Sequence, residues 1–174
     1  IVPVTMSYEY EPCDYLKTRE LLAVLDGDSR EKEKGEDLNS ILTGITQYKG
    51  GVHIHVGDPI TREDLEPYRG DDFATFSARI CDMIDSRITS NYKYFPSNYV
   101  AYDLLHGTTR YSDHYTPDYR AAFIKRMEKL FLDAGSDTPF REYLPQTDIY
   151  TNPLSPEELR KAREIFLGIY AHPL

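Results

Sequence analysis

The sequence predicts a helix-rich α/β fold, and three observations lead to this prediction. Two short segments, residues 1–8 and 52–56, have the β-branched or alternating apolar pattern that is typical of strands. Beyond residue 60, apolar residues recur every three or four positions, which is the spacing of amphipathic helices. A chain of 174 residues can also bury a hydrophobic core without a disulfide framework. We therefore expect two strands with helices between them, followed by a long helical extension.

The first predicted strand and the helix after it have clear boundaries. Residues 1–8 are apolar and β-branched enough for a buried strand, in which Pro3 is tolerated near the start. Pro12 closes the polar stretch that breaks the strand, and a helix is expected from about residue 14 to 25, with Gly27 at its end. The highly charged residues 26–37 are expected to form a solvated loop or a frayed helix end.

A short helix and the second strand follow. Gly50-Gly51 is expected to end this helix. The helix is predicted from four apolar residues at helical spacing: Leu38, Ile41, Leu42 and Ile45. Residues 52–56 then alternate with period two before the turn at residues 57–59. Side chains of a strand alternate between its faces, so we expect Val52, Ile54 and Val56 to face the helices, while His53 and His55 face away.

The rest of the chain is predicted to be helical. Residues 61–64 and 155–158 resemble capping boxes, and Thr116-Pro117 offers an N-cap followed by proline. Between them, residues 97–105 form a shorter helix, and Gly135 is expected to end the helix that starts at Pro117. We expect the apolar stripes of three of these helices to share one core: Phe73, Phe76, Ile80, Met83 and Ile84, then Phe123, Met127 and Leu130, and finally Ile165, Phe166 and Ile169.

Net charge and composition exclude several classes of function. The formal charge is −9, which argues against general binding to nucleic acid and against docking on anionic lipid by this chain alone. The tyrosines of residues 92–102 could stack on bases, but their helical spacing favours amphipathic core residues. Cys13 and Cys81 lack a CxxC partner and are interpreted as reduced, partly buried thiols of a cytosolic protein. The longest aliphatic stretch is too short to cross a bilayer.

Histidines and carboxylates give three candidate sites. His53 and His55 share one strand face, a spacing that can hold a metal, but no third ligand is signalled nearby, so we interpret them as half-exposed sheet residues. His53-x4-Asp58 has the spacing of a histidine base with an orienting carboxylate, but a mid-strand histidine and a turn aspartate need not converge. A polar segment between helices offers a third candidate, a divalent-metal site: His106, Asp113 and His114, with Asp103 and Asp118 nearby.

Two patches, taken in order, resemble a known family. Residues 1–4 (Ile-Val-Pro-Val) resemble the fourth conserved block of the 1-acyl-sn-glycerol-3-phosphate acyltransferases, and residues 52–60 resemble that family's later strand, which leads to G-x-P-I. Three further segments look like a bacterial branch that carries a long helical extension: residues 7–14, 35–40 and 97–103. The core-family similarity covers about residues 1–60. The resemblance implies an incomplete C-terminal part of an acyltransferase sheet domain, with two recognisable strands, followed by a helical extension.

The resemblance also implies where the chemistry would lie. In that family a His-x4-Asp motif deprotonates a glycerol hydroxyl that attacks an acyl thioester, and an F-P-E-G-T block with an arginine binds the acceptor phosphate. Both precede the V-P-V strand, so His53-x4-Asp58 does not inherit the catalytic role. The chain, which opens within a strand and without an initiator Met, is expected to be a piece of a longer enzyme and inactive by itself. Of the family's functional positions, the resemblance places only Pro3 and Val4 in this chain, as residues that line the substrate groove.

The expected function follows from this resemblance, and two alternatives stay open. The parent enzyme is expected to use a thioester of acyl carrier protein or coenzyme A, with no other cofactor, and a lysophospholipid acceptor, in the cytoplasm or at the cytoplasmic membrane face. Residues 1–60 would be acyltransferase-like, and residues 61–174 would pack on them as an extension in one compact unit. The first alternative is a helical interaction module that binds a partner or a second copy of itself, for which an exposed strand edge would be suited. The second is a metal-dependent hydrolase that uses His106, Asp113 and His114.

Overall fold

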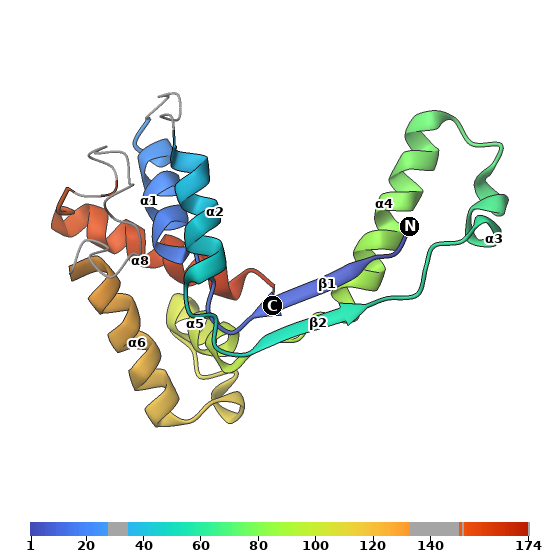
Figure 1. The fold of residues 1–174 in the computed structure, drawn as a ribbon. Coiled ribbons are helices and arrows are strands. Elements are labelled where there is room, and N and C mark those ends of the chain that lie inside the picture. Colours follow the sequence, from blue (N-terminus) through green and yellow to red (C-terminus); the bar gives the residue numbers. More distant parts are fainter. Residues whose placement is uncertain (28–34, 133–149, 151, 174) are drawn as a thin grey trace. The chain divides into compact units, whose positions relative to one another are not determined.

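The computed structural model describes residues 1–27, 35–132, 150 and 152–173 (Figure 1). These residues are mostly helical, and their one sheet consists of two antiparallel strands, which confirms the helix-rich α/β class. In chain order the elements are β1 (Val4–Tyr8), α1 (Asp14–Leu25), α2 (Glu36–Thr46), β2 (Val52–Val56), α3 (Arg62–Leu65), the 3-10 turn η1 (Glu66–Tyr68), α4 (Phe73–Thr89), α5 (Pro96–His106), the 3-10 turn η2 (Ser112–His114), α6 (Pro117–Leu132) and α8 (Pro156–Ala171).

Contacts divide the chain into two compact units. Unit 1 contains Ile1–Tyr8 and Gly51–Tyr94, and unit 2 contains Glu9–Gly50 and Phe95–Leu174. Each unit is therefore built from two separate stretches of the sequence. The boundary expected at residue 60 lies within the second stretch of unit 1, and the two domains predicted from the sequence stay a prediction.

Unit 1 is organised around the ribbon of β1 and β2. The strands pair from Val4 opposite Val56 to Tyr8 opposite Val52, so the two predicted strands do lie in one sheet. Side chains alternate between the two faces as expected. However, the polar face is the one that helix α4 covers: Thr5 Oγ1 donates to the carbonyl of Ile88 at 3.3 Å.

The predicted orientation of β2 is therefore wrong. Val52, Ile54 and Val56 are exposed, while His53 and His55 are half-buried on the same face as Thr5. Alternation shows only that the two faces of a strand differ, and the packing partner decides which face is covered. Here the partner offers carbonyl groups near the end of α4, which suit hydroxyl and imidazole side chains better than aliphatic ones.

Helix α4 begins at a well-formed N-cap but has no buried residue. The Asp72 carboxylate accepts from the backbone N–H groups of Ala74 and Thr75 at 3.0 and 3.1 Å. The predicted apolar stripe is present, but Phe73 is 85% exposed and the remaining members are half-buried: Phe76, Ile80, Met83, Ile84 and Ile88. The expectation of one core shared by α4, α6 and α8 is therefore wrong, because α4 belongs to unit 1 and contributes no residue to the core.

Unit 2 contains the hydrophobic core, in which α8 packs against α1 and α5. Phe123 of α6 and Phe166 of α8 are completely or almost completely buried, with ring centroids 6.1 Å apart. The predicted capping box fixes the start of α8, because the N–H of Ser155 donates to Glu158 at 2.7 Å and the N–H of Glu158 donates back to Ser155 at 3.3 Å. The core members are Tyr15, Leu16, Leu22, Val100, Ala101, Phe123, Met127, Phe131, Tyr150, Ala162, Phe166, Leu167, Tyr170 and Ala171.

Other local predictions can be compared with the structure directly. Helix α1 ends at Leu25, and Gly27 follows with a φ of 88°, a left-handed conformation that glycine adopts readily. Cys13 is half-buried as expected, but Cys81 is exposed. Residues 28–34 of the predicted loop and Gly135 lie outside the described residues. Among the helices that the structure describes, none combines the length and the apolar character needed to cross a bilayer.

Candidate functional site

The outer face of the β1–β2 ribbon is an uncovered apolar surface. Five aliphatic side chains from the two strands lie on it, and each is roughly half exposed or more: Val4, Met6, Val52, Ile54 and Val56. We call these five residues the ribbon face. Scattered exposed apolar residues are normal, but a contiguous set on one face marks an interaction surface.

Pro3 and Val4, the predicted substrate-groove residues, take different positions in this ribbon. Val4 is exposed on the ribbon face, opposite Val56, whereas Pro3 is buried. Backbone hydrogen bonds continue beyond the strands: the N–H of Gly57 donates to Pro3 O at 2.9 Å, and the N–H of Ile60 donates to Ile1 O at 2.7 Å. The ribbon therefore extends along the whole of both segments, with Val4 facing outward.

The histidines of β2 have a structural contact on the covered face. His53 Nε2 lies 3.2 Å from the carbonyl oxygen of Asn91, just after α4. Asp58 is exposed in the turn, where its backbone carbonyl accepts from Arg87 at 2.7 Å. Within the described part of the chain, no hydrogen bond joins His53 to Asp58, so the geometry does not assemble a base with an orienting carboxylate.

The structure does not group the three predicted metal ligands of the polar segment into a metal site. His114 stacks on Tyr99 at 4.2 Å between ring centroids, and His106 lies against Tyr102 at 4.3 Å. Both histidines and Asp113 are exposed. Across residues 1–27, 35–132, 150 and 152–173, no three histidine, cysteine or acidic side chains are grouped so that they could hold a metal ion.

Asp103 is the residue that organises this segment. Its buried carboxylate accepts hydrogen bonds from Thr108 Oγ1 at 2.7 Å, from Tyr115 Oη at 2.8 Å and from the N–H of Tyr111 at 3.0 Å. Burial of the carboxylate opposes ionisation, but these hydrogen bonds prevail and hold the pKa of Asp103 below its ordinary value. The carboxylate therefore fixes the loop after α5 rather than a metal ion.

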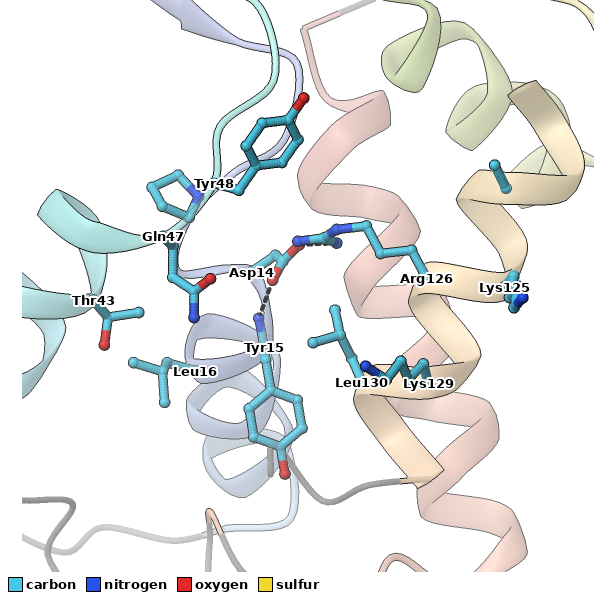
Figure 2. Close-up of a pocket in the computed structure, with 12 residues that line it drawn as sticks. Asp14, Tyr15, Leu16, Thr43, Gln47, Tyr48, Lys125, Arg126, Lys129 and Leu130 are labelled. Atoms are coloured by element: carbon cyan, nitrogen blue, oxygen red, sulfur yellow. Dashed lines mark hydrogen bonds and ion pairs between the residues drawn. The ribbon is translucent and has the colours of Figure 1, made fainter. Parts of the chain in front are cut away.

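A cavity of about 390 Å³ lies in unit 2, between the start of α1, the end of α2 and the middle of α6 (Figure 2). Its lining combines apolar and cationic side chains. The residues around it are Pro12, Asp14, Tyr15, Leu16, Thr43, Gln47, Tyr48, Ala122, Lys125, Arg126, Lys129 and Leu130.

Asp14 and Arg126 form an ion pair in the wall of this cavity. Arg126 Nη1 lies 2.6 Å from Asp14 Oδ2, and the same carboxylate accepts from Tyr170 Oη and from the N–H of Tyr15, both at 2.7 Å. Asp14 is buried, whereas the Arg126 side chain is 29% exposed. Burial acts against the positive charge, but the adjacent Asp14 carboxylate prevails and raises the pKa of Arg126.

The sequence analysis did not identify this cavity. Asp14 and Arg126 are 112 residues apart and belong to no spacing motif. The only local signal was the cluster of Lys125, Arg126 and Lys129 on one helix of an acidic chain, which can equally be a solvated face.

Comparison with known proteins does not identify a relative. No family model, no curated protein and no solved structure matches the chain.

Proposed function

We propose that this chain is the C-terminal part of a bacterial glycerolipid acyltransferase and that its ribbon joins the sheet of the catalytic half. One observation carries the proposal: the two segments that resemble conserved strands of that family are hydrogen-bonded partners. Val4 pairs with Val56, and Ile1 bonds to Ile60 at the far end. Two strands of one sheet domain are expected to lie side by side, so the pairing of these two segments supports the proposal.

The ribbon face supports the second half of the proposal. Ile54 and its four neighbours present an apolar surface that is uncovered in the described residues. Burying such a surface is favourable by about 25 cal/mol per Å² of apolar area removed from water. The catalytic half of the enzyme would cover it, and Val4 would then face the substrate groove, with Pro3 behind it.

This assignment defines the chemistry of the complete enzyme. The catalytic half would supply the histidine base and the phosphate-binding block, and would bind an acyl thioester of acyl carrier protein or coenzyme A and a lysophospholipid acceptor. The parent enzyme would work at the cytoplasmic face of the membrane, where this acceptor is found. The present chain would contribute strands and the helical extension, and no catalytic residue.

The reading frame that encodes the chain provides the first test. We expect codons for a His-x4-Asp and then an F-P-E-G-T upstream of Ile1. If that upstream sequence lacks both motifs, the family assignment is wrong.

Acyl transfer by the chain itself is the second test, and we expect none above background with lysophosphatidate and radiolabelled acyl thioester. Adding the encoded upstream half should restore transfer. Ile54→Lys, which places a charge on the ribbon face, should abolish both association and activity, whereas Phe73→Lys, at an exposed position off the ribbon, should not. Activity of the chain alone that disappears in His53→Ala would instead make His53-x4-Asp58 the catalytic motif.

A second candidate is self-association, in which this chain is an interaction module. It is favoured by the same apolar face and by the two-stranded sheet, whose outer strand edges have no strand partner among the described residues. Sedimentation velocity separates the two candidates. A dimer of the isolated chain that Ile54→Lys dissociates would favour the interaction module, whereas a monomer that associates only with the upstream half would favour the acyltransferase.

A further inference from the structure

The cavity in unit 2 has the size and lining of a small-molecule site. Its volume of about 390 Å³ falls in the usual range of ligand pockets, and such pockets combine apolar walls with a few converging polar groups. Leu16 and Leu130 line it from α1 and α6, and the Gln47 amide, just after α2, points toward the start of α1 (Figure 2).

The charge of the lining is opposite to the charge of the chain. Lys125, Arg126 and Lys129 stand against a single carboxylate, Asp14, although the chain as a whole carries −9. Cationic side chains therefore outnumber carboxylates among the residues that line the cavity. A partly enclosed site strengthens such a field relative to open water, which favours an anionic occupant.

Arg126 is held in place with most of its donors unused. A guanidinium has five N–H donors, and Asp14 takes one of them. The group also lies over the Tyr10 ring, at 5.0 Å from its centroid. In the part of the chain that the structure describes, no other hydrogen bond is formed by Arg126. A partly exposed, positioned guanidinium of this kind is suited to binding a carboxylate or phosphate through paired hydrogen bonds.

We infer that this cavity binds a small anionic amphiphile, with its oxyanion on Arg126 and Lys129 and its short apolar chain against Leu16 and Leu130. The oxyanion is a carboxylate or a phosphate monoester, which present the same acceptor chemistry to a guanidinium. The inference goes beyond the acyltransferase proposal and does not rest on it, because every residue of the cavity lies in unit 2 and none belongs to the ribbon.

Isothermal titration calorimetry with four probes tests this inference: octanoate, octyl phosphate, 1-octanol and inorganic phosphate. We expect octanoate, octyl phosphate or both to bind with a one-to-one stoichiometry. Octanol lacks the charge and phosphate lacks the apolar chain, so each should bind at least about tenfold more weakly, a difference of about 1.4 kcal/mol. The stronger of the two anionic amphiphiles identifies the head group.

Two variants and a control locate the binding. Lys129→Gln and Arg126→Lys should each raise the dissociation constant at least about tenfold, since each weakens or removes charge-assisted hydrogen bonds. Arg126→Lys keeps a cation beside Asp14, and thermal unfolding should show that it remains folded. Arg160→Gln removes an equally charged side chain from an exposed position on α8, where it pairs with Glu164, and should bind as the wild type does.

Four results would overturn the inference. Octanol binding as tightly as octanoate and octyl phosphate would show a purely apolar cavity. Inorganic phosphate binding as tightly as octyl phosphate would show an ion site without an apolar part. Unchanged binding in both Lys129→Gln and folded Arg126→Lys, or no binding of either amphiphile, would show that the cavity does not hold this ligand.

Discussion

Asp14 at the start of α1 and Arg126 in the middle of α6 form an ion pair 2.6 Å long, across 112 residues of sequence. The carboxylate is buried and also accepts from Tyr170 of α8, so one side chain connects three helices. Hydrogen bonds to a charged group that is shielded from water contribute more than neutral ones. The packing of unit 2 around the cavity therefore depends on a polar contact as well as on its aromatic core.

Replacing this carboxylate should destabilise the protein measurably. We expect Asp14→Asn to lower the free energy of unfolding by about 1.5–3 kcal/mol, the range for hydrogen bonds to charged groups, because it removes the ion pair without changing the shape of the side chain. Urea unfolding followed by circular dichroism measures this change. Glu164→Gln is the control, since its pair with Arg160 is exposed and should contribute about 0–1 kcal/mol. Equal effects of the two variants would contradict the role given to Asp14.

Two phenylalanines should differ strongly in their contribution to stability. Phe166 has no exposed surface, so Phe166→Ala should cost about 3–5 kcal/mol through lost burial and the cavity left behind. Phe76 of α4 is only half-buried, and its replacement by alanine should cost clearly less. Phe73→Ala, at a position that is 85% exposed, is the control and should be almost neutral. Thermal unfolding of the three variants tests this order of stability losses. A larger loss of stability in Phe76→Ala than in Phe166→Ala would contradict it.

Asp103 should make the stability of unit 2 depend on pH in the acid range. Its pKa lies below the ordinary 3.8 in the folded protein. The stabilisation it provides is therefore complete above that ordinary value and is lost as pH falls through the folded-state pKa. Asp103→Asn should destabilise the protein by about 1–3 kcal/mol at pH 7, because the three groups that donate to the buried carboxylate lose a charged acceptor.

The difference between wild type and Asp103→Asn is the quantity to measure, because other carboxylates also titrate in this range. We expect the difference in unfolding free energy to be constant from pH 7 to about pH 5 and to shrink below about pH 4. Urea unfolding at a series of pH values measures it. A difference that grows toward acid pH would have the wrong sign for a carboxylate stabilised in its ionised form.

The polar segment after α5 should not respond to metal. His106 and His114 stack on different tyrosines, so we expect zinc or manganese to leave the thermal midpoint of the wild type unchanged. Replacing either histidine by alanine should cost about 0.5–1.5 kcal/mol, the contribution of a ring–ring contact. If metal stabilised the wild type and this effect were lost in His114→Ala, the result would support the alternative function of a metal-dependent hydrolase.

Local chemistry explains which parts of the fold could be predicted from sequence. The N-terminus of α8 follows from Ser155 and Glu158, three residues apart, and the strand at 52–56 follows from its alternation. Neither prediction needs knowledge of the rest of the chain. The prediction of which face of β2 is covered was wrong, because that depends on the carbonyl groups at the end of α4. No local sequence pattern reveals those groups.

The candidate sites were also not predictable from local sequence patterns. The ribbon face was expected to be buried, since the five residues that form it are aliphatic. The cavity was missed altogether, because Asp14 and Arg126 meet only through the packing of α1 against helices that come much later in the chain. A charged residue near the start of a helix and a basic cluster on another carry no signal of their contact.

The pairing of Tyr8 with Val52 has a consequence for how this protein could have arisen. These two residues close one end of the ribbon, yet the chain leaves unit 1 after Tyr8, builds α1 and α2 of unit 2, and returns at Gly51. In a simple hairpin a turn of a few residues would join such strands. Residues 9–50 occupy the place of that turn, and they carry Asp14 and build the core of unit 2 together with residues that follow residue 95. The lineage of the ribbon and that of the cavity can therefore be traced separately, by asking which related chains keep a short turn between these two strands.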